Sequence, residues 1–276
     1  MPSFSSQDDE VEASKAPLMD HIIELRSRLI RALIALIVAF LVSFIFAGDI
    51  YNFLVWPYDY VITSMTGKHA TLIFTAPQEF FLTKVKVAFY AGIFFAFPVI
   101  ASQLYRFVAP GLYKHERRAF LPYLVATPIF FFFGALLVYF MLPGVLGFFA
   151  SMQETSDNGI KIELLPKVSE YLSLVMTLTL AFGIVFQMPV VLTLLAQIGL
   201  VNSKQLKAYR RYAIIIAFIV AAVLTPPDPL SQVSLALPTI LLYELTIFAV
   251  KYVERRAERE RNGDQDKGPT GTDLTS

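Results

Sequence analysis

Long apolar runs alternate with short polar segments along this sequence, a pattern typical of helices that cross a membrane. Stretches without a charged residue cover 32–48, 87–105, 119–153, 171–203, 212–227 and 229–243, the last continuing past Glu244 to Val250. Crossing a hydrocarbon core of about 30 Å takes roughly 20 helical residues, so the second, third and fourth stretches are long enough and the first is long enough with its flanks. Ala213 to Thr225 would extend only about 20 Å, which predicts a re-entrant segment or a short span in a thinned bilayer.

The composition agrees with a membrane protein. Of 276 residues, 56% are hydrophobic and only 16% are charged, which is too apolar for an ordinary soluble domain. Cysteine is absent, which excludes disulfides, thiolate catalysis and thiolate metal sites.

The basic residues predict which side each connection faces. Segments 1–31, 106–118, 204–211 and 251–276 hold 18 of the 23 Lys and Arg residues. This distribution predicts six crossings with both termini cytoplasmic. Four spans followed by a buried hairpin would give the same distribution, but "LTPPDPL" at 224–230 favours a tight turn between two short helices. We therefore predict an all-α integral membrane protein of six helices, with the fifth and sixth short.

Some of the segments outside the spans are expected to be folded and others to be disordered. In the connection 49–86, "DIYNFLVWPYDYVITSM" predicts an interfacial amphipathic helix with Trp56 in the headgroup layer. Residues 1–17 are predicted to be a disordered cytoplasmic tail, 18–252 the membrane domain, and 253–276 a charged tail that is mostly disordered after a short helical extension. Kinked helices are expected at the prolines in or beside spans, which are Pro98, Pro122, Pro128, Pro143, Pro189 and Pro238.

Polar groups within the spans are candidates for function. A charge at the bilayer centre costs about 3 kcal/mol, so Glu244 should face protein or water or be protonated, unless it snorkels or pairs with Lys251. Gln187 suits a hydrogen bond between helices, worth about 0.6 kcal/mol. Asp228 in "TPPDP" most simply closes a turn.

Enzymatic motifs are missing from the sequence. It contains no HExxH, no GxSxG, no Gly-rich phosphate loop and no paired intramembrane Asp. The chain is therefore predicted to be a non-enzyme that uses no cofactor and no metal and binds no nucleic acid.

Two carboxylates lie next to spans on the side predicted to be cytoplasmic. Glu24 has Arg28 at i+4, a spacing that stabilises a helix by a few tenths of a kcal/mol, and Glu116 is surrounded by Lys114, Arg117 and Arg118. Each could belong to a solvated charged face. Each could also hold the guanidinium of an arginine-bearing peptide through a bidentate pair.

Several motifs resemble, in order and spacing, those of the TatC family of twin-arginine protein translocase subunits. They are "HIIELRSRL", "PQEFF", "APGLYKHERR", the pattern FG..F..P and "TPPDPLSQ", and the resemblance extends from about Leu18 to Tyr252. It implies a cupped, kinked bundle of six helices in the bacterial inner membrane. It also implies a receptor that binds twin-arginine signal peptides of folded proteins at the cytoplasmic face, in a complex driven by the proton-motive force.

The resemblance assigns roles to individual residues. Glu24 and Glu116 match the acids that recognise the arginine pair, and Phe107 and Arg118 belong to the same region. Pro57 matches the first outer loop, Asp228 the outer turn between the last two helices, and Glu244 the acid of the sixth helix. Gln187 stands where many members have Glu, so a mechanism that needs a proton at this position is not expected here. The resemblance still allows a polar contact of Gln187 with the signal peptide or with the span of a partner subunit.

The resemblance also implies partners. These are single-span subunits of the TatA and TatB types, membrane lipids, and further TatC copies within one complex. Two alternatives are a secondary transporter for a small solute, with Glu244 and Gln187 as midplane ligands, and a purely structural scaffold. Crosslinking to a substrate distinguishes the three.

Overall fold

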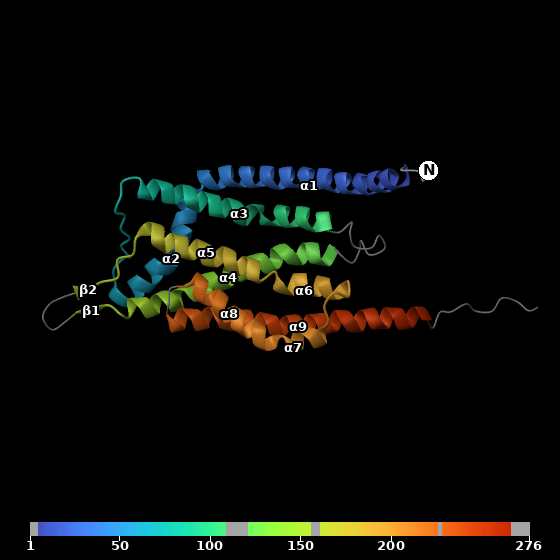
Figure 1. Ribbon diagram of the computed structural model, residues 1–276. Coiled ribbons are helices and arrows are strands. Elements are labelled where there is room, and N and C mark those ends of the chain that lie inside the picture. The colour runs from blue at the N-terminus through green and yellow to red at the C-terminus, as the bar shows by residue number, and fades with distance from the viewer. Residues whose placement is uncertain (1–4, 109–120, 156–160, 226–227, 266–276) are drawn as a thin grey trace, which may run out of the picture. The chain divides into compact units, whose positions relative to one another are not determined.

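The computed structural model of the protein describes residues 5–108, 121–155, 161–225 and 228–265 (Figure 1). Its helices are α1 (Ser5–Ile45), α2 (Ala47–Thr66), α3 (Glu79–Val108), α4 (Leu121–Ala150), α5 (Val168–Val185), α6 (Met188–Gln197), α7 (Ser203–Ala208), α8 (Arg210–Leu224) and α9 (Pro229–Gln265). Two-residue strands β1 (Glu154–Thr155) and β2 (Lys161–Ile162) pair antiparallel. The chain forms two compact units, one of Met1–Val55 with Phe74–Pro128 and one of Trp56–Ile73 with Ile129–Ser276.

Five helical segments in the described part of the chain are long and apolar enough to cross a membrane. They are His21–Ile45, Glu79–Phe107, Pro122–Ala150, Val168–Gln197 and Pro229–Arg256. The predicted class, an all-α integral membrane protein, is confirmed. α8 is also apolar, but its 15 residues extend only about 22 Å, less than a typical hydrocarbon core. The count of six spans with cytoplasmic termini therefore stays a prediction.

In the first unit, α1 packs along α3. Gly92 makes the close approach possible, because a methyl group on its Cα would lie 2.8 Å from the Cα of Phe40. Most apolar side chains of α1 between Met19 and Ile45 are exposed, with Leu29 65% and Ile45 77% exposed. Such a surface is stable only in lipid or against another protein.

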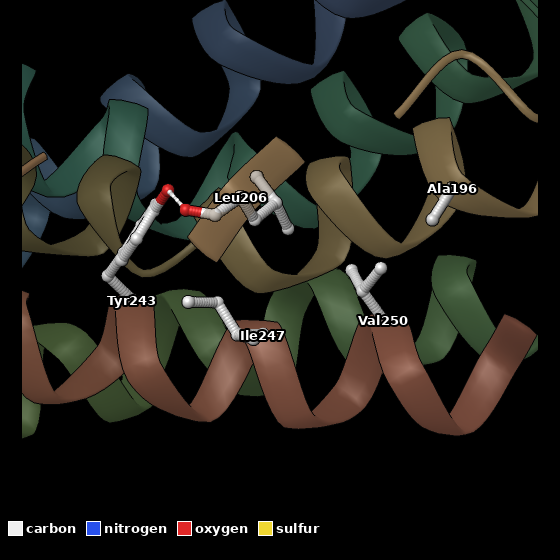
Figure 2. Close-up of a cluster of buried hydrophobic side chains, with 5 residues drawn as sticks. All are labelled: Ala196, Leu206, Tyr243, Ile247 and Val250. Atoms are coloured by element: carbon white, nitrogen blue, oxygen red, sulfur yellow. Dashed lines mark hydrogen bonds between the residues drawn. The ribbon is translucent and has the colours of Figure 1, made fainter. Parts of the chain in front are cut away.

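In the second unit, α4 and α5 pack closely through two glycines. A methyl group on Gly134 would lie 2.6 Å from the carbonyl oxygen of Phe182, and one on Gly183 would lie 2.5 Å from the ring of Phe131. At the other end of this unit, α6 and α7 pack on α9 (Figure 2). Their buried cluster consists of Ala196, Leu206, Tyr243, Ile247 and Val250.

The predicted fourth span is interrupted. α5 ends at Val185 and α6 begins at Met188, with Gln187 at its N-cap and Pro189 close behind. Proline has no N–H to continue the helical hydrogen bonds, which explains the break. The helix is therefore interrupted beside Pro189, where the sequence predicts a kink.

α2 confirms the helix predicted in the connection after the first span. Its Trp56 and Tyr60 are 52% and 55% exposed, and their rings stack at 5.4 Å. Tyr58 faces inward and donates a hydrogen bond to the carbonyl oxygen of Leu164 at 3.1 Å. This bond ties α2 to the segment before α5.

The helices extend further at both ends than the sequence predicts. α1 begins at Ser5 and so includes most of the segment expected to be a disordered tail, and α9 continues to Gln265. The extension of α9 is rich in Glu and Arg, which favour helix, and that of α1 contains two Glu, two Ala and one Lys. The boundaries of the membrane domain stay a prediction.

Candidate functional site

Glu24 lies near the beginning of the apolar part of α1, with 34% of its side chain exposed. Its carboxylate pairs with Arg28, whose Nε and Nη2 both donate to Oε1, the Nε at 2.9 Å. The helical spacing of four residues brings the two side chains together, as the sequence predicts. Within the described residues Oε2 accepts no hydrogen bond, so one oxygen of Glu24 remains open to a further donor.

Phe107 lies at the end of α3 and is half-buried. Its ring stacks on the imidazole of His21, with the ring centroids 4.3 Å apart and the planes at 21°. His21 and Glu24 are three residues apart and therefore neighbours on one face of α1. The stacking thus brings Phe107 next to the part of α1 that carries Glu24.

Glu116 and Arg118 belong to residues 109–120 and lie outside the described residues. The structure therefore brings Glu24 and Phe107 into one region and leaves the predicted positions of Glu116 and Arg118 as expectations.

Gln187 lies at the break between α5 and α6 and is half-buried. Its Nε2 donates to the carbonyl oxygen of Gly183 at 3.3 Å, one helical turn earlier. The side chain therefore hydrogen-bonds to the backbone at the end of α5.

Glu244 is ion-paired within the protein. Its Oε2 accepts from Nη2 of Arg210 at 2.6 Å, which joins α9 to the first residue of α8. Pairing with Lys251, one of the alternatives considered from the sequence, is therefore wrong. Lys251 lies on the same helix about two turns away, whereas Arg210 reaches Glu244 from the neighbouring helix.

The two predicted outer-segment residues have local structural roles. Pro57 is buried inside α2. Asp228 immediately precedes α9, and its Oδ1 accepts from the N–H of Ser231 at 2.7 Å. This is the contact of an N-cap residue, which agrees with the predicted role of Asp228 in the turn.

In the part of the chain that the structure describes, no group of three or more His, Asp or Glu side chains is placed to hold a metal ion. The polar groups instead form pairs with each other or with the backbone. The chemistry that this arrangement offers is recognition of cations and of peptide groups.

Two residues of these sites were not identified from the sequence. Arg210 lies in a basic segment that we interpreted only as an orientation signal, and His21 lies outside the uncharged stretch of the first span. A signal for Arg210 was available, because Arg210 and Arg211 are the basic residues next to the apolar run of α8 and either could neutralise an acid in a neighbouring helix. The His21–Phe107 contact joins residues 86 positions apart and has no local signal.

Comparisons with known proteins agree with each other. The family model described as Sec-independent protein translocase protein (TatC) matches residues 20–238. The TatC protein of Magnetococcus marinus is 46% identical over 89% of this chain and 88% of its own, and that of Escherichia coli K12 is 38% identical over 88% of this chain and 92% of its own. A crystal structure of the twin arginine translocase receptor TatC, 37% identical, superposes with a TM-score of 0.72 over 85% of this chain and 99% of that one.

These matches cover most of the chain and most of each relative, and the family consists of translocase subunits rather than enzymes. The chain therefore belongs to the TatC family, as a multi-pass core subunit of the twin-arginine (Sec-independent) protein translocase in the bacterial inner membrane.

Proposed function

We propose that the beginning of the apolar part of α1, around His21 and Glu24, and the end of α3 form a cytoplasmic site at which this translocase subunit binds signal peptides carrying consecutive arginines. Glu24 and Glu116 bind the arginine guanidinium groups, and Phe107 and Arg118 complete the site. A carboxylate is suited to this task because it accepts two parallel hydrogen bonds from one guanidinium.

The observation that carries the proposal is the stacking of His21 on Phe107 at 4.3 Å. It supports a single site made from both helices, because it brings an aromatic surface from α3 next to the face of α1 that bears Glu24. An arginine paired with Glu24 could therefore also pack on an aromatic ring.

The existing partner of Glu24 does not block such a site. The Glu24–Arg28 pair is partly exposed and spans one helical turn, so it contributes only a few tenths of a kcal/mol. A guanidinium from a peptide can displace or share this contact at low cost. The other basic residues of segments 1–31 and 106–118 then serve mainly to keep these segments on the cytoplasmic side.

The same proposal includes the rest of the complex. Subunits of the TatA and TatB types contact Gln187 and Glu244 through their single spans, several copies of this chain take part, and the proton-motive force drives transport through the assembly. The break of the helix at Gln187 supports this assignment, because it leaves polar backbone groups at membrane depth. A secondary transporter is not favoured by the family matches.

Photocrosslinking in native membranes tests the site. A photoreactive residue replaces Ile22, which is 50% exposed, next to His21 and not assigned to the site. We expect crosslinks to a signal peptide with its arginine pair, and a loss of about tenfold or more when both arginines are replaced by lysine, because lysine cannot form the bidentate pair.

Two charge variants make the test specific. Glu24→Gln should reduce the crosslink strongly, whereas Glu170→Gln removes an exposed carboxylate of α5 and should leave it unchanged. Equal crosslinking of the arginine and lysine peptides, in both the unchanged chain and Glu24→Gln, would count against this site while leaving the family membership intact.

A further inference from the structure

We propose that α7, the first turn of α8 and the residue between them form a docking surface for the headgroups of anionic phospholipids. The surface, here called the basic shelf, consists of Lys204, Lys207, Tyr209, Arg211 and Tyr212. All five residues are exposed. It belongs to one of the segments whose Lys and Arg content predicts a cytoplasmic position.

The basic shelf is held rigidly on α9. The hydroxyl of Tyr243 donates to the carbonyl oxygen of Leu206 at 2.8 Å, within the buried cluster that joins α6, α7 and α9 (Figure 2). One helical turn before Leu206, the backbone N–H and the Oγ of Ser203 donate to the two carboxylate oxygens of Glu254 at 2.7 and 2.5 Å. These two ties fix the backbone between them, so the lysines of α7 are presented in a defined arrangement.

The acids near the basic shelf are already occupied. Glu254 accepts both hydrogen bonds from Ser203, and Glu244 is paired with Arg210 at 2.6 Å. Among the described residues, no carboxylate forms an ion pair with Lys204, Lys207 or Arg211. Three positive charges therefore remain for an external anion.

The position of the basic shelf favours lipid over an acidic protein. α8 begins at Arg210 and becomes entirely apolar from Ala213, and its Ile215, Ile216 and Val223 are 55%, 57% and 79% exposed. This exposed apolar surface belongs in the hydrocarbon core, so the residues just before it lie at the level of the headgroups.

The aromatic residues of the shelf suit the same location. Tyr209 and Tyr212 are 58% and 48% exposed, and tyrosine is enriched where membrane meets water. The guanidinium of Arg211 lies 4.8 Å from the centre of the Tyr212 ring and donates to its hydroxyl at 3.1 Å. This contact orients the guanidinium while leaving donors for a phosphate.

The absence of cysteine allows a direct test on the full chain. Ala208→Cys adds one thiol beside the shelf at an exposed position, and a donor dye is attached to it. The protein is reconstituted in phosphatidylcholine vesicles with about one fifth phosphatidylglycerol, and energy transfer is compared for traces of acceptor-labelled phosphatidylglycerol and phosphatidylcholine. We expect local enrichment of phosphatidylglycerol by roughly two- to fivefold, because basic residues at a membrane surface attract anionic lipid.

Two triple variants decide the outcome. Lys204→Gln with Lys207→Gln and Arg211→Gln should bring the enrichment close to one. The matched control, Lys68→Gln with Lys84→Gln and Lys86→Gln, removes the same charge from the connection after α2 and the beginning of α3, and should retain the enrichment. Enrichment that survives in the shelf variant, or that is absent from the unchanged chain, would overturn the proposal, and the second result would direct attention to an acidic protein segment instead.

Discussion

Arg210 and Glu244 form an ion pair between the first turn of α8 and the middle of α9, with Nη2 2.6 Å from Oε2. Their side chains are 46% and 34% exposed in the protein. The pair explains how α9 carries a carboxylate inside an apolar segment, since the charge is neutralised by a long side chain that enters from the end of the neighbouring helix.

This relationship predicts coupling between the two residues. Arg210→Gln leaves a carboxylate without its partner inside an apolar helix, so it should destabilise the protein more than Glu244→Gln does. The double variant should be more stable than the sum of the single effects predicts, with a coupling of about 0.5–1 kcal/mol for a partly exposed pair. The free energies of unfolding of the two single variants and the double variant, measured on the purified proteins in detergent, form a double-mutant cycle. Strictly additive changes in these free energies would contradict the pairing.

The packing of α4 on α5 predicts different effects of alanine substitution at two glycines of α4, Gly134 and Gly144. A methyl group on Gly134 would lie 2.6 Å from the carbonyl oxygen of Phe182 and 2.8 Å from the ring of Phe186, so Gly134→Ala should destabilise the protein by about 1–3 kcal/mol. Gly144 has nothing within 4 Å of the corresponding position, so Gly144→Ala should be neutral or slightly stabilising because alanine favours helix. Thermal unfolding compares the stabilities of the two variants. Equal effects of the two changes would show that helix propensity, rather than close contact with α5, determines the change in stability.

The features that could be predicted from the sequence depend on residues that are close to one another along the chain. The helix over 47–66, the break near Pro189 and the contact of Asp228 with the next helix each follow from a few adjacent side chains. The same holds for Glu24 and Arg28, because a separation of four residues on a helix settles their contact.

The features that could not be predicted join distant parts of the chain. Glu244 has Lys251 within reach along its own sequence, yet its partner is Arg210, because α8 and α9 pack side by side. Tyr243 and Leu206, and His21 and Phe107, are brought together in the same way. Periodicity identifies which residues face inward but does not identify the neighbouring helix.

The segment after α2 predicts a dependence on pH. Asp59 accepts hydrogen bonds from the N–H of Ala70 at 2.8 Å and from Nδ1 of His69 at 3.2 Å. The backbone N–H of Ala70, helped by His69, holds the pKa of the Asp59 carboxyl below its usual range. Because folding lowers this pKa, the ionised Asp59 carboxylate stabilises the folded loop at pH values above the ordinary pKa of about 3.9. This contribution is lost as the pH falls through the lowered pKa of the folded state.

Hydrogen exchange at Ala70, corrected for the intrinsic rate at each pH, measures this effect. Protection should be constant from neutral pH down to about pH 4 and should fall on further acidification. Asp59→Asn should have low protection throughout. His69→Gln should change it little, because the His69 side chain is 89% exposed and the Ala70 N–H bond remains. An unchanged acid profile in Asp59→Asn would assign the effect to another group.

The Glu24–Arg28 pair predicts competition with the signal peptide, if the proposed site is correct. Arg28 donates to Oε1 of Glu24 through two nitrogens and occupies part of the surface that a peptide guanidinium would use. Removing this competitor with Arg28→Gln should strengthen binding of a twin-arginine peptide about twofold, in keeping with a pair worth a few tenths of a kcal/mol. Glu24→Gln should weaken binding by about tenfold or more, because a hydrogen bond to a charged group is lost.

Fluorescence anisotropy of a labelled signal peptide with the purified chain measures both affinities. The salt dependence of the peptide affinity separates competition by Arg28 from a structural role of Arg28. If Arg28 competes, Arg28→Gln leaves the Glu24 carboxylate unpaired, so peptide binding should become more sensitive to salt. Arg26→Gln removes the same charge from an exposed position of α1 for which no pairing with Glu24 is found among the described residues, and serves as the control. Arg28→Gln that weakens binding as much as Glu24→Gln would show that Arg28 orients the carboxylate for the peptide instead of competing with it.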